Sequence, residues 1–447
     1  MHDRIGSYPR IFGVEEIGKL DKLVISGGNP LYGKVKISGA KNAALAILAA
    51  SLLTDETCII ENVPYIGDVI TLCDILRGLG ADVRVEKDGK IYVLADRVRD
   101  WRASYDMVQK MRASYYLLGV LLARFGQAEV GMPGGCDIGP RPIDQHVKAF
   151  EALGATVEIE HGTVFAHTDG LKGNEVYFDK YSVGATINAM LCAVKAEGQT
   201  LIVNAAKEPH VVDLASYLNS MGADIRGAGT DEIKVRGVEY LHGSEYTIIP
   251  DQIEAGTYMI ASAATGGDVT IADVIPKHLE AITAKLMEAG VMVEEGTDWV
   301  RVYREQRPQR INIQTQPYPG FPTDMQQPMG VLLSVAEGTS VITENIFDSR
   351  FKYLEELRKM GAKVQVDGRV AIIEGVENLT GAPVEANDLR AGAALVIAGL
   401  IARGVTEISN AHFIDRGYED IEAKLSELGA DIQRMDRKGR TRKIKAV

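Results

Sequence analysis

One alternation of hydrophobic and polar positions recurs along the chain. A helical pattern ends in an apolar residue and a glycine, and a short stretch follows in which apolar and polar residues alternate, as in Asp82–Val85 and Lys363–Val366. Glycine in this place suits the left-handed backbone that closes a helix, so each is predicted to end one. The glycines stand roughly 70 residues apart, at Gly80, Gly154, Gly222, Gly290, Gly361 and Gly429. Such a period predicts six copies of one structural unit.

The pattern predicts two kinds of helix in each unit. One kind is apolar on all sides and must be buried on most faces. The other is amphipathic, as in Tyr353–Lys359. We therefore expect a mixed α/β fold of the α+β type, with three units per domain, apolar helices at the centre and sheets outside. A doubly wound parallel sheet would need buried strands and amphipathic helices instead. The predicted apolar helices include Asn42–Leu53, Met111–Ala123, Ala185–Val194, Met325–Val335 and Ala391–Ala402.

Size and composition narrow the function classes. The chain has 447 residues, enough for two or more domains with cores of their own. A net charge of −12 disfavours a general nucleic-acid binder, so any phosphate recognition would depend on a few local Lys and Arg residues. Residues 1–20 lack the apolar core of a signal peptide, and no apolar run is long enough to span a membrane. We predict a cytoplasmic protein whose N-terminal extension (1–20) and basic tail (436–447) are appendages.

Cysteine usage points to chemistry at one position. The four cysteines lack the C-x-x-C spacing of a metal site, and such sparse use fits a reducing compartment. Cys136 lies with Arg141 in a Gly- and Pro-rich loop between a predicted strand, Ala128–Met132, and a predicted helix, Ile143–Leu153, with Pro142 in its first turn. Such a loop lets backbone N–H groups and a helix N-terminus face an anion. Taken alone, it fits equally well a surface loop with an incidental cysteine.

Polar residues collect at two equivalent places in the repeat. Stacked copies would place them on equivalent edges, so two facing domains would direct them into one cleft, where helix N-termini add positive potential. Several cations together with a thiol and a carboxylate indicate chemistry on a multiply anionic substrate. Near the starts of the apolar helices stand Lys41, Asn42, Arg112, Ser182, Glu254, Asp324 and Arg390, and before the amphipathic helices stand Cys136, Arg141, Glu208, Arg350 and Arg416.

Six motifs together resemble the UDP-N-acetylglucosamine 1-carboxyvinyltransferases, a family of enolpyruvyl transferases. They are Ser38–Ala44, Met111–Ser114, Pro133–Cys136, Ile138–Pro142, Phe321–Gln326 and Ile414–Tyr418. The resemblance extends over about residues 21–435. It implies a two-domain inside-out α/β barrel in which each domain holds three βαβαββ repeats. It also implies that residues 41–249 form one domain, carrying the Cys136 loop, and that residues 21–40 with 250–435 form the other.

The resemblance implies a reaction. The enolpyruvyl group of phosphoenolpyruvate would pass to the 3-hydroxyl of UDP-N-acetylglucosamine through a tetrahedral ketal, with release of phosphate, as the first committed step of peptidoglycan precursor synthesis. An acid must protonate the methylene carbon and a base must take the hydroxyl proton. Cys136 matches the family's proton donor. Asp324 matches the favoured base, although a role mainly in positioning the sugar stays open. Thr323 and Gln326 also form the pattern of a capping box, with Thr323 as N-cap. No metal ion and no cofactor are implied, and the oligomeric state is not predicted.

The resemblance also assigns the binding residues. For phosphoenolpyruvate these are Lys41, Asn42, Arg112, Arg141 and Arg416. For the nucleotide sugar they are Arg112, Arg141, Pro142, Ile143, Asp144, Gln145, Lys180, Ser182, Val183, Gly184, Asp324 and Ile346. The family often has Leu at position 145 and Val at position 346, and we interpret both departures as tolerated. Supporting residues are Glu208, Asp251, Phe347, Arg350, Asp388 and Arg390, of which Asp388 equally fits a helix N-cap and Phe347 a core aromatic.

Two other functions remain open at this level. A shikimate-phosphate enolpyruvyl transferase would share the fold but has a different Lys motif and lacks the Pro-Gly-Gly-Cys loop. A non-catalytic paralogue that only binds nucleotide sugar would have lost Lys41, Cys136 or Asp324, and all three are present.

Overall fold

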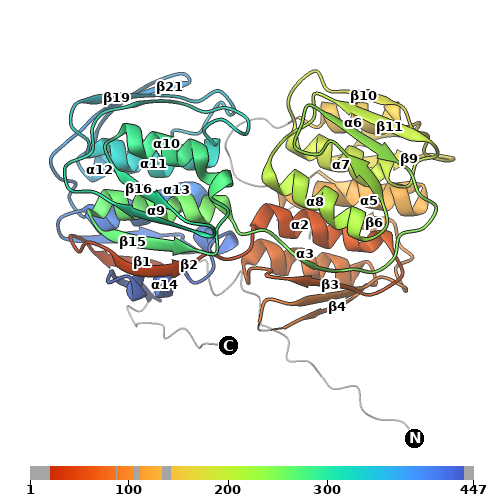
Figure 1. Ribbon diagram of the computed structural model, residues 1–447, viewed down its shortest axis with the longest axis horizontal. Helices are drawn as coiled ribbons and strands as arrows, with labels where there is room; N and C mark the ends of the chain where they lie inside the picture. The colour runs from red at the N-terminus through yellow and green to blue at the C-terminus, as the bar shows by residue number, and fades with distance from the viewer. Residues whose placement is uncertain (1–20, 87, 104–107, 109–110, 133–141, 437–447) are drawn as a thin grey trace, which may run out of the picture.

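The chain forms two halves that lie side by side (Figure 1). The structure, a computed structural model, describes residues 21–86, 88–103, 108, 111–132 and 142–436. Each half has its own hydrophobic core: one is built from buried residues between Ala40 and Ile248, and the other from residues 23–37 and 253–432. The chain crosses between the halves at two adjacent points, where the Ala40 amide donates to the Ile249 carbonyl at 2.7 Å and the Asp251 amide donates to the Ser38 carbonyl at 2.9 Å.

Six four-stranded sheets share one strand order. In each, a short edge strand runs parallel to the second strand, and the second, third and fourth strands are antiparallel. In the first half the sheets are β14 (Glu245–Thr247), β3 (Cys58–Glu61), β5 (Ile91–Leu94) and β4 (Asp82–Val85); β6 (Arg102–Ala103), β7 (Gln127–Gly131), β9 (Thr163–His167) and β8 (Thr156–Glu160); and β10 (Glu175–Tyr177), β11 (Gln199–Val203), β13 (Glu232–Arg236) and β12 (Asp224–Arg226).

The second half repeats this order and contains both ends of the described chain. In the sheet of β22, β23, β1 and β24, the N-terminal strand β1 takes the third place, and Ile25 on it pairs with Ile432 on β24. In the other five sheets that place belongs to the strand that follows the fourth in sequence. The sheets are β2 (Tyr32–Lys36), β15 (Asp268–Ala272), β17 (Trp299–Tyr303) and β16 (Met292–Glu295); β18 (Asn312–Gln314), β19 (Thr339–Thr343), β21 (Val370–Glu374) and β20 (Lys363–Asp367); and β22 (Pro383–Glu385), β23 (Val405–Ser409), β1 (Lys22–Ser26) and β24 (Asp431–Met435).

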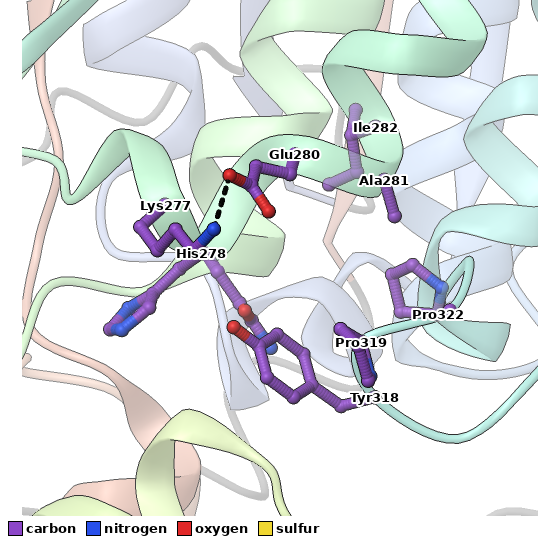
Figure 2. A pocket seen from close by; sticks show the side chains of 10 residues that line it. Lys277, His278, Glu280, Ala281, Ile282, Tyr318, Pro319 and Pro322 are labelled. Carbon is purple, nitrogen blue, oxygen red and sulfur yellow. Dashed lines mark hydrogen bonds and ion pairs between the residues drawn. The ribbon is translucent and has the colours of Figure 1, made fainter. Parts of the chain in front are cut away.

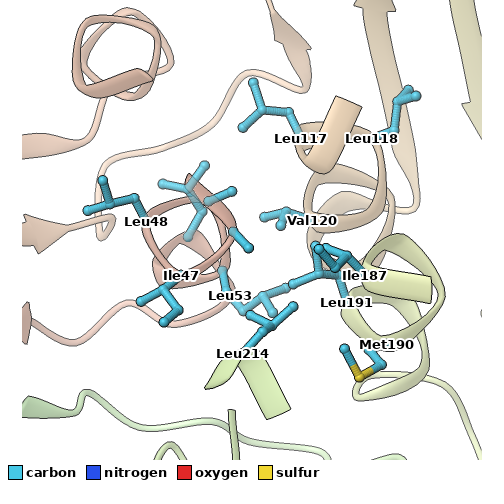
Figure 3. Packing of buried hydrophobic residues seen from close by; sticks show 14 of the residues in the cluster. Ile47, Leu48, Leu53, Leu117, Leu118, Val120, Ile187, Met190, Leu191 and Leu214 are labelled. Carbon is cyan, nitrogen blue, oxygen red and sulfur yellow. The ribbon is translucent and has the colours of Figure 1, made fainter. Parts of the chain in front are cut away.

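Six apolar helices are buried over most of their length in the two cores. In the first half their side chains gather between the helices, as Val120, Ile187 and Leu191 do in Figure 3. Gly119 permits a close approach of two of these helices, because a Cβ there would lie 2.6 Å from the Asn188 side-chain oxygen, which accepts a hydrogen bond from the Gly119 amide. The helices are α2 (Lys41–Ala50), α5 (Tyr116–Phe125), α7 (Val183–Ala193), α9 (Gln252–Thr265), α11 (Gln326–Ser334) and α13 (Leu389–Ile401).

Six further helices each end just before one of the repeated glycines. All six glycines have positive φ, between 81° at Gly290 and 103° at Gly80, so the predicted helix ends are confirmed. These helices are α3 (Gly67–Gly78), α6 (Asp144–Ala152), α8 (Pro209–Ser220), α10 (Glu280–Glu288), α12 (Tyr353–Lys359) and α14 (Ile421–Glu427). Short 3-10 helices are η1 (Ser51–Leu53), η2 (Arg112–Tyr115), η3 (Pro276–Leu279), η4 (Thr323–Met325) and η5 (Ala411–Arg416).

The mixed α/β class expected from the sequence is confirmed, with small differences at the element ends. The predicted helix over 111–123 divides into η2 and α5, and Pro142 precedes α6 instead of lying in its first turn. In the described part of the chain, no helix has both the length and the apolar character needed to cross a membrane.

Candidate active site

A buried carboxylate joins two of the predicted cations across the two halves. Asp68, in the first turn of α3, is 5% exposed. It accepts hydrogen bonds from Lys41 Nζ at 3.1 Å and from Arg416 Nε at 2.9 Å. Burial opposes ionisation of Asp68, but attraction to Lys41 and Arg416 outweighs it and lowers its pKa. Lys41 and Arg416 belong to different halves, so Asp68 is the point where η5 is tied to α2 and α3.

A second ion cluster surrounds Asp324, in η4. Arg350 Nη2 donates to one carboxylate oxygen at 2.6 Å and Arg390 Nε donates to the other at 3.0 Å. The two guanidinium side chains are 4% and 5% exposed, whereas the Asp324 side chain keeps 28% exposure. Burial raises the pKa of Asp324, but Arg350 and Arg390 more than reverse this, with a smaller contribution from Lys41, and hold the pKa well below its usual range. The two ion clusters lie close together, because Gly417, next to Arg416, packs between them: a Cβ there would lie 2.6 Å from the side chain of Leu389, which precedes Arg390, and 3.4 Å from Lys41 Cδ.

The predicted capping box at Thr323 and Gln326 is wrong. The N-cap of η4 is Pro322, with no side-chain cap. The Thr323 hydroxyl is engaged elsewhere, since it donates to Glu344 at 2.9 Å and accepts from Arg350 Nη1 at 2.8 Å. The side-chain amide of Gln326 is buried and reaches no partner among the described atoms. Tertiary hydrogen bonds therefore override the local sequence pattern.

Two supporting carboxylates are helix caps. Asp388 accepts from the backbone amides of Arg390 and Ala391 at 2.8 and 2.9 Å and caps α13. Asp251 caps α9 in the same way and also accepts from the Lys41 amide at 3.0 Å. Asp388 therefore fixes the backbone at Arg390, in the first turn of α13. Asp251 fixes the backbone at Lys41 and, in doing so, joins the start of α9 in the second half to the start of α2 in the first.

The predicted nucleotide-side residues of the first half lie on two adjacent helix starts. Residues 142–145 lead into α6, and residues 180–184 lead into α7, where the Ser182 hydroxyl accepts from the Ala185 amide. Gln145 connects them, because its side-chain oxygen accepts from the Asp179 amide at 3.0 Å and its nitrogen donates to Asp144 at 3.0 Å. Gly184 fits closely, since a Cβ there would lie 2.8 Å from His146 Nε2. Among these residues, the exposed ones are Pro142, Asp144 and Lys180. Ile143 is buried and Val183 is half-buried.

Glu208 lies beside the start of α7. Its carboxylate accepts from the Tyr181 hydroxyl, which in turn accepts from the Lys207 amide at 3.0 Å. Burial raises the pKa of Glu208, although bonds from Tyr181 and the Tyr318 backbone partly offset this.

The predicted residues Ile346 and Phe347 lie after β19. Both are half-buried, and their amides donate to Glu344 at 2.8 and 3.2 Å. Phe347 also stacks under Arg350, with Cζ 5.1 Å from the ring centre. The aromatic ring therefore packs against a guanidinium of the Asp324 cluster, which the interpretation as a core aromatic did not anticipate.

Cys136 and Arg141 lie outside the described residues, and so does the side chain of Arg112, whose backbone begins η2. Asn42 follows Lys41 in the first turn of α2. The other three cysteines are buried. Burial raises the pKa of Cys58 and Cys192, and raises that of Cys73 to about 12. None of these three thiols is therefore suited to acid–base chemistry near neutral pH.

Sequence reasoning missed Asp68 and His210. Asp68 stands at the start of an amphipathic helix, the same place in the repeat that holds Arg350 and Glu208, so the repeat register could have identified it. His210, in the first turn of α8, lies near Asp251 and Asp324; burial lowers its pKa to about 4 against their attraction. This pKa favours the neutral imidazole near neutral pH.

A small pocket lies beside the segment that leads to Asp324 (Figure 2). Lys277 and Glu280 form an ion pair at 2.6 Å on its wall, and the Tyr318 ring faces them. Its wall contains none of the residues predicted for catalysis or substrate binding, so it is not the candidate site. It is lined by Gln252, Lys277, His278, Glu280, Ala281, Ile282, Tyr318, Pro319, Gly320 and Pro322. The part of the chain that the structure describes holds no group of three potential metal ligands.

Sequence comparison relates nearly all of the described chain to enolpyruvyl transferases. The family profile "EPSP synthase (3-phosphoshikimate 1-carboxyvinyltransferase)" matches residues 25–425. UDP-N-acetylglucosamine 1-carboxyvinyltransferase 3 of Caldanaerobacter subterraneus subsp. tengcongensis is 59% identical over 416 residues, 93% of this chain and 100% of the relative. UDP-N-acetylglucosamine 1-carboxyvinyltransferase of Clostridium botulinum is 58% identical over 417 residues, again 93% of this chain and all of the relative.

Solved structures agree at the level of the fold. The enolpyruvyl transferase NikO from Streptomyces tendae superposes with a TM-score of 0.85 at 28% identity, covering 94% of this chain and 99% of that one. An EPSP synthase from Acinetobacter baumannii superposes with a TM-score of 0.72 at 18% identity, covering 93% of this chain and all of that one, which is evidence for the fold alone.

Proposed function

The chain belongs to the UDP-N-acetylglucosamine 1-carboxyvinyltransferases, within the enolpyruvyl transferase family, and we propose that it transfers the enolpyruvyl group of phosphoenolpyruvate to the 3-hydroxyl of UDP-N-acetylglucosamine. Phosphate is released, and the product enters peptidoglycan precursor synthesis. Full-length relatives at 58–59% identity carry this name, and this likeness supports the choice of acceptor.

The observation that carries the proposal is the pair of adjacent ion clusters. Lys41 and Arg416 are brought together from the two halves by Asp68, and Asp324 is held beside them by Arg350 and Arg390. Guanidinium groups suit the bidentate contacts that phosphate and carboxylate offer. Lys41, Asn42, Arg112, Arg141 and Arg416 would hold the phosphate and carboxylate of phosphoenolpyruvate.

Cys136 is assigned as the acid that protonates the methylene carbon. Its three fellow cysteines are buried with raised pKa values, so they offer no competing thiol. A thiol near Lys and Arg residues has its thiolate stabilised, which makes the thiol a stronger acid and so a better proton donor to the methylene carbon.

Asp324 acts on the sugar hydroxyl as an ionised carboxylate. Two guanidinium groups orient its oxygens, and the exposed part of the side chain can accept a hydrogen bond from the 3-hydroxyl. A strongly lowered pKa makes Asp324 a weak base in this resting arrangement. Its first contribution is therefore to orient the hydroxyl, and proton removal requires that the cations around it be drawn to the substrate.

The nucleotide would bind along the two adjacent helix starts of the first half. The N-terminus of α7, at Ser182–Gly184 behind Lys180, suits a diphosphate, because backbone N–H groups and the helix dipole favour an anion there. Residues 141–145 with Ile346 would contact the remainder of the nucleotide sugar. The supporting residues would hold the binding segments in place. They are Glu208, Asp251, Phe347, Arg350, Asp388 and Arg390.

The finer architecture is also proposed. Six sheets of one strand order around buried helices support an inside-out α/β barrel with three βαβαββ repeats per domain. The two separate cores support domain boundaries at 41–249 and at 21–40 with 250–435. A cytoplasmic location stays a prediction.

Phosphate release tests the proposal. With phosphoenolpyruvate present, UDP-N-acetylglucosamine should stimulate release and shikimate 3-phosphate should not. Stimulation by the shikimate acceptor alone would assign the chain to the other branch of the family, and no release with either acceptor would indicate a protein that binds without catalysis.

A further inference from the structure

Glu344 is a buried carboxyl group that the assignments above leave unused. It follows β19 and is 1% exposed. Four donors reach its two oxygens: the Thr315 hydroxyl at 2.8 Å, the Thr323 hydroxyl at 2.9 Å, and the amides of Ile346 and Phe347 at 2.8 and 3.2 Å. So many hydrogen bonds on a fully buried acid link several segments rigidly.

The segments that Glu344 joins are the two that face the acceptor sugar in the proposed site. One oxygen holds the backbone at Ile346 and Phe347, and the other holds Thr323, the residue before Asp324. Thr315 adds a third tie to the loop, because its hydroxyl accepts from the Asn345 amide at 2.8 Å.

Glu344 is connected to Asp324 through the Thr323 hydroxyl and the Arg350 guanidinium, and the donor and acceptor of each hydrogen bond on this path are fixed. Arg350 can only donate, and it donates to the Thr323 hydroxyl through Nη1 and to Asp324 through Nη2. The Thr323 hydroxyl, having accepted from Arg350, turns its own proton to Glu344. The orientation of the Arg350 guanidinium, and through it of the Asp324 carboxylate, therefore depends on an acceptor at position 344.

We infer that Glu344 is a positioning residue for the acceptor substrate, holding the Ile346–Phe347 loop and the Asp324 carboxylate in one fixed relation. The inference rests on the proposed function, since it concerns the sugar side of that site. It assigns no role to Glu344 at the phosphoenolpyruvate side, where Lys41 and Arg416 are tied by Asp68 instead.

Glu344→Gln is the direct test. An amide has one acceptor oxygen, so either Thr323 or the Ile346–Phe347 amides must face an NH₂ group that cannot accept from them. One lost hydrogen bond to a charged acceptor predicts that KM for UDP-N-acetylglucosamine rises about tenfold and kcat falls about tenfold, while KM for phosphoenolpyruvate stays within about twofold. Purified full-length protein and phosphate release give all three constants.

Glu356→Gln is the matched control. Glu356 is also a buried acid of the second half, 8% exposed, and accepts from Lys359 and from the Glu385 amide, none of which belongs to the site. It should lower the melting temperature without changing either KM. If Glu344→Gln has wild-type constants, or raises both KM values alike as a general loss of structure would, the inference is overturned.

Thr323→Val keeps the inference testable if Glu344→Gln does not fold. This variant removes the hydroxyl that connects Glu344 to Arg350, so it should raise KM for UDP-N-acetylglucosamine and lower kcat as Glu344→Gln does. Thr323→Ser restores the hydroxyl and should recover most of the lost kcat and affinity. Unchanged constants in Thr323→Val would overturn the inference. Failure of the wild-type protein to release phosphate would instead refute the proposed function, so the two failures are distinguishable.

Discussion

Replacing Asp324 with asparagine separates charge from shape at the centre of the proposed site. The side chain keeps its size but loses its charge. Its single oxygen can accept from Arg350 or from Arg390, and the amide nitrogen must then face the other guanidinium. Both arginine side chains are at most 5% exposed, so water cannot replace the lost partner. In the variant, one of the two buried guanidinium groups therefore faces the amide NH₂ of asparagine, which cannot accept its hydrogen bond.

The magnitude follows from that burial. Removing one partner of a buried ion pair costs about 3–5 kcal/mol, and Asp324→Asn should lie near the lower end because one hydrogen bond survives. A loss of about 3 kcal/mol lowers Tm by roughly 6–12 °C in a domain of this size class. Loss of the group that handles the sugar hydroxyl should lower kcat by about 10²–10⁴-fold. The dissociation constant for UDP-N-acetylglucosamine, measured by calorimetry, should change far less than kcat does.

The pH dependence of the stability difference is the sharper assay. The pKa of Asp324 is lowered in the folded state, so its stabilising effect is fully present above the unfolded value of about 3.9 and is lost only as pH falls through the folded value. The free-energy difference between wild type and Asp324→Asn should thus be equal at pH 8 and pH 5 in urea titrations. A difference that shrinks between these two pH values would show that Asp324 titrates there and would refute the reasoning. Equal losses in kcat and nucleotide-sugar affinity would assign Asp324 to binding.

Three further predictions concern other parts of the chain. Cys136→Ala should abolish turnover and covalent labelling by an epoxide phosphonate, checked by mass spectrometry; full labelling of the variant would show that the wrong thiol was chosen. Asp68→Asn should raise KM for phosphoenolpyruvate about tenfold or more and that for the nucleotide sugar much less, because it loosens Lys41 and Arg416; steady-state kinetics with each substrate varied decides, and equal increases contradict the assignment. Gly119→Ala should destabilise the protein by about 1–3 kcal/mol in urea titrations, because its Cβ would overlap the Asn188 side chain; an unchanged midpoint would contradict the packing argument.

The repeat made the fold predictable. A glycine before an alternating strand indicates a helix end, because glycine adopts the left-handed backbone of that position without steric cost. This cause depends only on neighbouring residues, so the sequence predicted all six left-handed glycines correctly. Helices apolar on all sides, such as 391–402, could only be central. By contrast, β1 completes the sheet of β24 from the other end of the chain, and no local pattern indicates that pairing.

The sequence predicted site residues correctly only where the residue type itself indicates the function, as Lys and Arg at a helix start indicate anion binding. Lys41, Arg350, Arg390 and Arg416 stood out as cations at helix starts, and the structure brings them into two ion clusters. Asp68 did not stand out, because an acidic residue in the first turn of an amphipathic helix is common for reasons of the helix dipole. At Thr323 the local pattern predicted a cap, but the tertiary partner Glu344 prevailed. Side chains whose partners are distant in sequence are those that sequence reasoning misses.

The two ion clusters also explain how an acidic protein can take anionic substrates. Each cluster holds two cations and one carboxylate: Lys41 and Arg416 with Asp68, and Arg350 and Arg390 with Asp324. Counted over these ion-paired side chains alone, each cluster has two positive charges and one negative charge, although the chain as a whole carries −12. Charges beyond about 8–10 Å are largely screened at physiological ionic strength, so the distant acidic surface acts weakly at the site, whereas the cluster charges and the nearby carboxylates of Asp251 and Asp388 act there directly. The carboxylates hold the cations in place before substrate arrives, and a phosphate must compete with Asp68 for Lys41 and Arg416, which favours substrates with more than one anionic group.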